Sequence, residues 1–480
     1  MRSLKQDTTY GVKWSSIESF SVQGMQFLFG VIMARLLLPE DYGILGMIGI
    51  FIAVSQTFIN CGFTSALIRK IDRSQEDSST VFYFNVIVAI LCYVVLFFSA
   101  PYIAFFFATP ILCEVLRVLA INLVIDSLGA VHRTQLLIRI DFKRLALISL
   151  ICCCLSSFFG LYLAYSGYGV WALVYQQILN AVLVTILSWF FSHWHPSFLF
   201  SWSSFRELFA FGSNLLVANL LHTVYNNITT IIVGKYYSAK DLGFYARGNN
   251  MAALPSGNIM AILQRVTFPI MAKIQDDQQY LLYVFEKYIR MSSLPIFFLM
   301  CLLAGISKPL VLILLTDKWA DAVIYLQILC FALMFDHITG INMNLLQVKG
   351  RSDYVLKTEV IKKGISFAMI LASIPFGIIA VCISRVLYTQ IAVFLSCYYT
   401  DKAYGLSYKR QLRDFSPYFI CAVVAMIPSL LLCSSDINPY LSLCVGGLAN
   451  VLFFYILIRK DMVWLELQNM LISKLKNRNS

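Results

Sequence analysis

Long apolar runs, separated by short polar turns, dominate this chain. A membrane-spanning helix needs roughly 20 predominantly apolar residues, and the sequence predicts about fourteen such runs. They lie at 17–38, 42–68, 81–107, 111–138, 145–165, 168–191, 208–233, 242–268, 286–306, 322–346, 360–379, 380–400, 416–433 and 439–458. The polar stretches between them are too short for a folded domain. The pattern therefore predicts an all-α polytopic membrane protein whose function resides in its spans.

Composition supports this class. Of the 480 residues, 59% are hydrophobic and 13% are charged, whereas soluble domains carry about 25% charged residues. Most of the thirteen cysteines lie inside apolar runs, where they are expected to act as small buried hydrophobes. No spacing of cysteine and histidine suggests a metal site, and we expect neither a metal nor a cofactor.

The net charge of +12 follows from topology. Most Lys and Arg residues, Lys362 and Lys363 among them, fall in segments that share one side if the N-terminus is cytoplasmic. The positive-inside rule then predicts that both termini lie in the cytoplasm. Anionic membrane lipids, and not nucleic acid, are the expected partners of these cations.

Two halves of the sequence resemble each other. Segments 34–43 and 234–243 both end an apolar run with a cation, an aspartate and a glycine at matching positions, and Asp126 and Asp336 lie in mid-span at matching positions further on. Because each copy holds six spans, the copies are parallel. The expected organisation is a six-helix lobe at 1–200, its repeat at 201–405, two further helices at 406–460 and a basic cytoplasmic tail at 461–480.

Three motifs point to a family: Gly11-x-x-Trp14, the segment 34–43 and the segment 62–69. With them the chain resembles the polysaccharide-transport (oligosaccharide flippase) branch of the multidrug/oligosaccharidyl-lipid/polysaccharide flippase superfamily. It is most similar to the subgroup linked to exopolysaccharide, colanic-acid and teichuronic-acid type polymers. The resemblance implies two lobes in a V and alternating access. It also implies movement of undecaprenyl-diphosphate-linked oligosaccharide from the cytoplasmic to the periplasmic leaflet of the bacterial inner (plasma) membrane, with polysaccharide polymerase machinery as a further partner.

Charged residues inside the spans are the first functional candidates, because charge in mid-membrane is costly. Asp126 and Asp336 are candidates for gating or for coupling to a proton or sodium gradient. The alternative is a structural ion pair within each lobe. The outer turns add candidate periplasmic-gate ion pairs, with surface pairing as the alternative: Arg35 with Asp41, and Lys235 with Asp241.

Cations and amides within the spans are candidates for substrate binding. Arg117, Arg247 and Arg385 enter their spans from the outer ends, and Arg265 lies toward a cytoplasmic end, so they could bind a diphosphate. Snorkelling to phospholipid headgroups is the alternative. A stripe of polar residues on one helical face suits sugar hydroxyls, with interhelical hydrogen bonds as the alternative. The stripe consists of Asn219, His222 and Asn226.

Two rival functions remain open. An ion-coupled multidrug antiporter of the same superfamily would need an acidic and aromatic cavity, whereas Arg at least equals Asp and Glu within these spans. A membrane polysaccharide polymerase or ligase would need a sizeable periplasmic loop, and none is predicted. No phosphate-binding Gly-x-x-x-x-Gly-Lys loop is present, so ATP is not the expected energy source and a transporter is favoured over an enzyme.

Overall fold

The computed structural model describes residues 4–70, 72–434, 438–466 and 468. Within this part of the chain the residues form helices and turns, with no β-strand. The helices are α1 (Leu4–Leu36), α2 (Pro39–Asn60), α3 (Phe63–Arg69), α4 (Gln75–Phe106), α5 (Leu112–Leu119), α6 (Ile121–Ile138), α7 (Phe142–Tyr165), α8 (Val170–Ser192), α9 (Trp202–Tyr236), α10 (Ala239–Lys273), α11 (Gln278–Gly305), α12 (Ser307–Leu315), α13 (Ala322–Leu333), α14 (Asp336–Val348), α15 (Ser352–Ser373), α16 (Ile378–Tyr404), α17 (Tyr408–Ser434) and α18 (Pro439–Ile458). Short 3-10 helices η1 (Asp317–Trp319) and η2 (Ile374–Phe376) complete the set.

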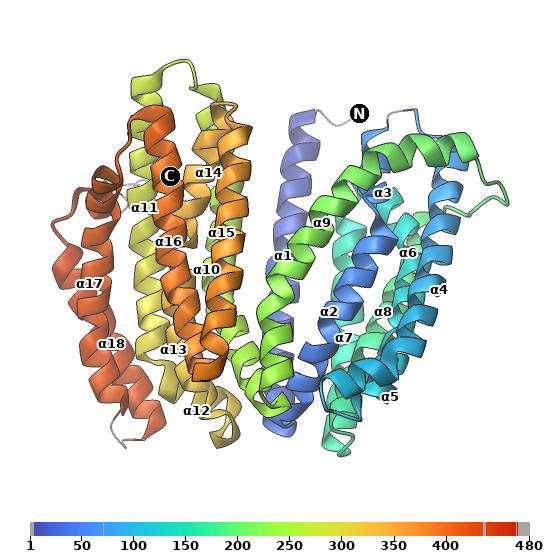
Figure 1. Ribbon diagram of the computed structural model, residues 1–480, viewed down its shortest axis with the longest axis horizontal. Coiled ribbons are helices and arrows are strands. Elements are labelled where there is room, and N and C mark those ends of the chain that lie inside the picture. Colours follow the sequence, from blue (N-terminus) through green and yellow to red (C-terminus); the bar gives the residue numbers. More distant parts are fainter. Residues whose placement is uncertain (1–3, 71, 435–437, 467, 469–480) are drawn as a thin grey trace, which may run out of the picture. The chain divides into compact units, whose positions relative to one another are not determined.

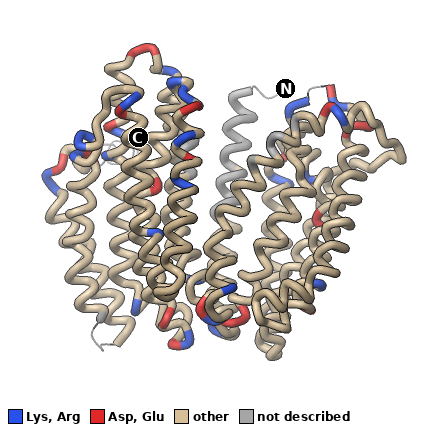
Figure 2. The backbone as a smooth tube through the Cα atoms, viewed as in Figure 1, with Lys and Arg blue, Asp and Glu red and all other residues tan. Residues whose placement is uncertain are grey.

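The predicted all-α membrane class is confirmed. Among the described residues, nine helical segments are long and apolar enough to cross a membrane. Figure 2 shows most charged residues near the helix ends and long uncharged stretches between them. The total of fourteen spans stays a prediction.

The chain forms two compact units, residues 1–243 and 244–480, and the division falls inside α10. The boundary near residue 200 that was predicted between the two six-helix lobes concerns the sequence repeats, and it stays a prediction. In unit 1, α1 packs on α7, α8 packs on both α6 and α7, and α2 packs along α9 (Figure 1). The first helix of the second sequence copy therefore belongs, by its contacts, to unit 1.

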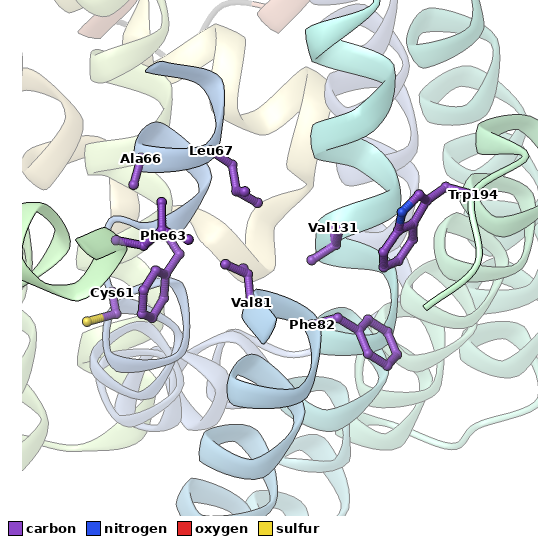
Figure 3. Packing of buried hydrophobic residues seen from close by; sticks show 9 residues of the cluster. Cys61, Phe63, Ala66, Leu67, Val81, Phe82, Val131 and Trp194 are labelled. Carbon is purple, nitrogen blue, oxygen red and sulfur yellow. The ribbon is translucent and has the colours of Figure 1, made fainter. Parts of the chain in front are cut away.

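A cluster of buried hydrophobic residues packs several helices of unit 1 together (Figure 3). Phe63 and Leu67 from α3 meet Val81 and Phe82 from α4 there, and the cluster also holds Trp194 from the turn before α9. The span that starts at Pro39 is divided into α2 and α3 by two residues with left-handed backbone, Cys61 (φ 38°) and Gly62 (φ 70°). This break directs Phe63 into the cluster, where the ring is 1% exposed.

Unit 2 is held together by α11, which packs extensively on α17, while α17 packs on α18. The two helices outside the sequence duplication are thus integral to this unit. At their cytoplasmic end, by the predicted topology, the Arg290 guanidinium donates two hydrogen bonds, of 2.9 and 2.6 Å, to Asp414 Oδ1. The Asp414 side chain is only 5% exposed, so this ion pair joins α11 to α17 in a partly buried setting.

We predict that Asp414→Ala lowers the free energy of unfolding by about 1–3 kcal/mol, because it removes charge-assisted hydrogen bonds from a buried partner. Thermal unfolding of the detergent-solubilised protein measures the change. The exposed pair Arg351–Asp353 provides the control, since both side chains are at least 38% exposed. Asp353→Ala should leave the midpoint unchanged. Equal losses in both variants would contradict the importance given to the α11–α17 pair.

Candidate functional site

The turns that carry the sequence repeat lie directly against each other. A Cβ atom added to Gly43, near the start of α2, would lie 1.7 Å from the carbonyl oxygen of Ala239. A Cβ atom added to Gly243, near the start of α10, would lie 1.9 Å from the carbonyl oxygen of Pro39. The contact is reciprocal, and only glycine permits it on either side. We call residues 39–43 and 239–243 the outer crossing.

Each half of the outer crossing is shaped by its own aspartate. The backbone N–H of Leu38 donates to Asp41 Oδ2 at 2.9 Å. In the second copy, the N–H and the hydroxyl of Ser238 donate to Asp241 Oδ2 at 3.3 and 2.7 Å. Both aspartates therefore cap the helix that follows, as acidic residues in a first turn do. Their predicted part in gating stays a prediction.

The neighbouring cations of unit 1 pack on aromatic residues. Lys235 donates to the carbonyl of Phe106 at 2.5 Å and lies 4.3 Å from the centroid of that ring. Arg117 donates to the carbonyl of Phe97 at 3.2 Å, with its guanidinium 4.4 Å from the ring centroid. Arg35 is exposed at the end of α1. These positions fit a membrane–water interface, where cations and aromatic rings are common.

The contact between the two sequence copies continues along α2 and α9. The hydroxyls of Thr57 and Thr223 are 3.2 Å apart. At the far end, a Cβ atom on Gly212 would lie 2.2 Å from the carbonyl oxygen of Cys61. The predicted polar stripe on α9, formed by Asn219, His222 and Asn226, is exposed. The side-chain amide nitrogen of Asn226 lies 3.2 Å from a ring nitrogen of His222.

Asp126 lies where two cavities of unit 1 meet. The side-chain amide of Gln56 donates to Asp126 Oδ2 at 3.1 Å, and both residues line both cavities. The first cavity, of about 280 Å³, is also lined by Asn60, Arg133 and Thr134. Its one lining cation, Arg133, is the electrostatic partner of Asp126 among the described residues. The Asp126 side chain is half-buried, and it borders two cavities that water can fill.

The second cavity, of about 370 Å³, has a lining that is half polar. Its amide and hydroxyl groups come from α1, α2, α6, α7 and α8: Gln26, Tyr42, Gln56, Asn122, Ser156, Ser157, Gln176, Gln177 and Asn180. Asn122 is 7% exposed, and its Oδ1 has no hydrogen-bond partner among the described residues. A buried acceptor of this kind needs a partner such as water or a cation.

In unit 2 the matching aspartate has cations beside it. Arg385 donates to the hydroxyl of Tyr245 at 3.1 Å and to Asn249 Oδ1 at 2.9 Å. Asp336 interacts electrostatically with Arg385 and with Lys362. The structure thus places Asp336 and Arg385, both predicted as site residues, in one charged group of unit 2.

Helix breaks help to place this group. The span that contains Asp336 divides at residues 334–335 into α13 and α14, so the carboxylate lies in the first turn of α14, where negative charge is favoured. Its neighbour His337 is buried and satisfied: Ser293 Oγ and the carbonyl of Met334 each lie 2.9 Å from a ring nitrogen. Asp336 itself remains exposed.

Sequence analysis missed Lys362 as a partner of Asp336. Lys362 lies in the middle of α15, is 6% exposed and pairs with Glu359. Its assignment to the cytoplasmic side stays a prediction. The charge of Asp336 was a usable signal, because a carboxylate in mid-membrane calls for a cation nearby. Two further cations predicted to bind substrate, Arg247 and Arg265, are not placed in either site by the described contacts. The Arg247 guanidinium lies 6.0 Å from the Trp319 ring centroid, and the Arg265 side chain lies outside the described residues.

Comparison with known proteins settles the family. Residues 32–324, more than half of the chain, match the model of a family described as polysaccharide biosynthesis protein. The chain belongs to this family. Family members are membrane transport proteins and not enzymes, so the branch inferred from the sequence motifs is confirmed.

Two individual relatives and one solved structure are also similar to this chain. The chain is 28% identical to the teichuronic acid biosynthesis protein TuaB of Bacillus subtilis over 358 residues, 74% of each chain. It is 24% identical to the lipopolysaccharide biosynthesis protein WzxC of Escherichia coli over 434 residues, 87% of this chain and 86% of WzxC. The structure of the lipid II flippase MurJ superposes with a TM-score of 0.72 at 14% identity, covering 92% of this chain and 98% of MurJ. This last likeness shows a flippase-type fold.

We predict that Gly43→Ala and Gly243→Ala each separate the outer crossing, because the added methyl group would overlap a backbone carbonyl. Amide hydrogen exchange in residues 38–47 and 238–247 should accelerate by about tenfold or more, since overpacking costs about 1–3 kcal/mol. Gly49→Ala on the same helix is the control, as a Cβ atom there meets nothing within 4 Å. Unchanged exchange in the first two variants would show that the contact does not hold the turns together.

Proposed function

We propose that this protein is a flippase for undecaprenyl-diphosphate-linked oligosaccharide. It moves the polysaccharide repeat unit from the cytoplasmic to the periplasmic leaflet of the bacterial inner membrane by alternating access. Both termini lie in the cytoplasm, and polysaccharide polymerase machinery takes up the product. The family and the MurJ-like fold support transport in polysaccharide biosynthesis, and the charges within the two units support the anionic cargo.

The observation that carries the cargo assignment is the presence, in both units, of cations inside helices that the sequence predicts to span the membrane. Arg133 lines the first cavity of unit 1, while Lys362 and Arg385 flank Asp336 in unit 2. Cations in this setting are costly and are normally retained for function. A diphosphate provides the negative charge that guanidinium and ammonium groups bind, whereas a cationic drug would be repelled by them.

Alternating access requires an outer closure that opens, and the outer crossing is our candidate. Its two turns touch through backbone atoms, and each turn is capped within its own copy. Separation therefore breaks no capping hydrogen bond. Pro255 and Gly257 inside α10 provide a place for that helix to bend, since a Cβ atom on Gly257 would meet nothing within 4 Å.

Ion coupling is assigned to Asp126 in preference to Asp336. Asp126 accepts a hydrogen bond from a neutral amide and borders two cavities, so a proton or a sodium ion can reach it. Asp336 lines neither of these two cavities.

The direct test is reconstitution into vesicles that contain undecaprenyl-diphosphate-linked oligosaccharide. A membrane-impermeant glycosidase reports which leaflet holds the sugar. We expect the purified protein to expose lipid-linked sugar that was initially protected, and to leave a fluorescent cationic drug in place. Export of the drug without movement of the sugar would instead identify a multidrug antiporter. Failure to move either substrate in vesicles with verified protein insertion would contradict the flippase assignment.

The coupling role makes a separate prediction. With a proton or sodium gradient imposed, the gradient-driven part of the rate should fall by about tenfold in Asp126→Asn, the size of a typical coupling between two bound species. Asp353→Asn, which changes an exposed carboxylate, should behave like the wild-type protein. A wild-type rate that ignores both gradients would remove the coupling role and leave the cargo assignment intact.

A further inference from the structure

A cavity in unit 2 lies apart from the charged group around Asp336. It has a volume of about 460 Å³ and is formed by the end of α11, by α12, by the start of α13 and by the end of α17. These elements occupy one end of the unit (Figure 1), the end that the predicted topology places at the outer membrane surface. Its charged lining residues are Lys308 and Asp321, and Gln327 adds an amide.

The helices next to the cavity are closely packed. A Cβ atom on Gly305 would lie 2.2 Å from Ser429 Oγ, so α11 and α17 are in close contact at this level. A Cβ atom on Gly446 would lie 2.6 Å from Cys433 Sγ, which joins α18 to α17 in the same way. The cavity itself lies where α12 and the start of α13 stand against the end of α17.

The lining combines one cation, one anion, one amide and a mostly apolar remainder. Leu312, Ile324 and Leu430 contribute the apolar surface, and Ile324 is 41% exposed. Asp321 is exposed, and Lys308 is partly exposed. Opposite charges in one half-open cavity at a membrane surface match a ligand that itself carries both charges beside an apolar chain.

We propose that this cavity binds a phospholipid whose headgroup carries a phosphate and a primary ammonium, that is, a phosphoethanolamine headgroup. The phosphate interacts with the Lys308 ammonium, and the lipid ammonium donates hydrogen bonds to the Asp321 carboxylate. The apolar residues contact the start of the acyl chains. The volume lies within the range of about 300–1,000 Å³ that small-molecule sites occupy.

Two other common headgroups fit the lining less well. A choline headgroup has no N–H to donate and is usually held by aromatic rings, and none of the described residues that line the cavity is aromatic. A phosphoglycerol headgroup carries a net negative charge, so Asp321 would repel it without gaining a cation. The pair of charges therefore selects for ethanolamine.

The site also accounts for a contribution of α17, which lies outside the sequence duplication. Leu430 and Cys433 of α17 line the cavity, so the helix builds a lipid site as well as packing on α11. Binding here requires neither a cargo nor an ion gradient, and it is independent of the flippase assignment.

The test is native mass spectrometry of the purified full-length protein, supplied with equal amounts of phosphatidylethanolamine, phosphatidylcholine and phosphatidylglycerol of identical acyl chains. The wild-type protein should retain phosphatidylethanolamine about tenfold better than either other lipid, the effect of one hydrogen bond to a charged group. Asp321→Asn should reduce this preference to the level of phosphatidylcholine. Lys308→Gln should weaken retention of all three lipids.

Lys318→Gln and Asp317→Asn provide matched controls, because both residues lie in η1 in the same outer turn and neither lines the cavity. They should retain the wild-type preference. Equal retention of the three lipids by the wild-type protein would overturn the proposal without relying on any variant. A loss of preference in the controls as large as in Asp321→Asn would overturn it as well.

Discussion

At the outer crossing, two backbone carbonyl oxygens stand where a side chain would otherwise begin. Gly43 and Gly243 come from matching positions of the two sequence copies, and each receives the carbonyl of the other copy's first helical turn. The packing of α2 against α9 continues from this point, so the contact fixes the position of the first helices of the second copy against α2. Because Asp41 and Asp241 cap their own helices, each turn keeps its shape without the other. A closure of this kind can be specific and still open at low cost.

The two intramembrane aspartates show how a duplicated position can diverge. Asp126 is bound by the neutral amide of Gln56 and borders two cavities, one of them lined by Arg133. Asp336 lies at a helix start with Lys362 and Arg385 as electrostatic partners. Each aspartate has at least one cation as an electrostatic partner, in keeping with the cost of an uncompensated charge in a membrane interior. Asp126 differs in that it borders two cavities, which is why we propose ion coupling at that position.

Much of the architecture was accessible from the sequence. Apolar run length predicted the helical membrane class, because backbone groups in a bilayer must be satisfied internally and uninterrupted apolar runs of about 20 residues fit a helix. The repeat identified Gly43 and Gly243, and Asp126 and Asp336, as matching positions. The sequence did not reveal that the glycines touch, because contact depends on the crossing of two helices. It also missed Lys362 as a partner of Asp336, since a lysine near a predicted span edge looks the same whether it reaches water or a carboxylate of the protein.

The central claim, that the outer crossing opens during transport, can be measured as a distance. Spin labels at Glu40 and Lys240, both exposed beside the crossing glycines, would report the separation of the two turns by pulsed electron resonance in a background free of other reactive thiols. The account predicts a short distance in the resting protein and a second, longer population that grows when lipid-linked oligosaccharide is added. A single short distance that persists while the protein moves its cargo would contradict it.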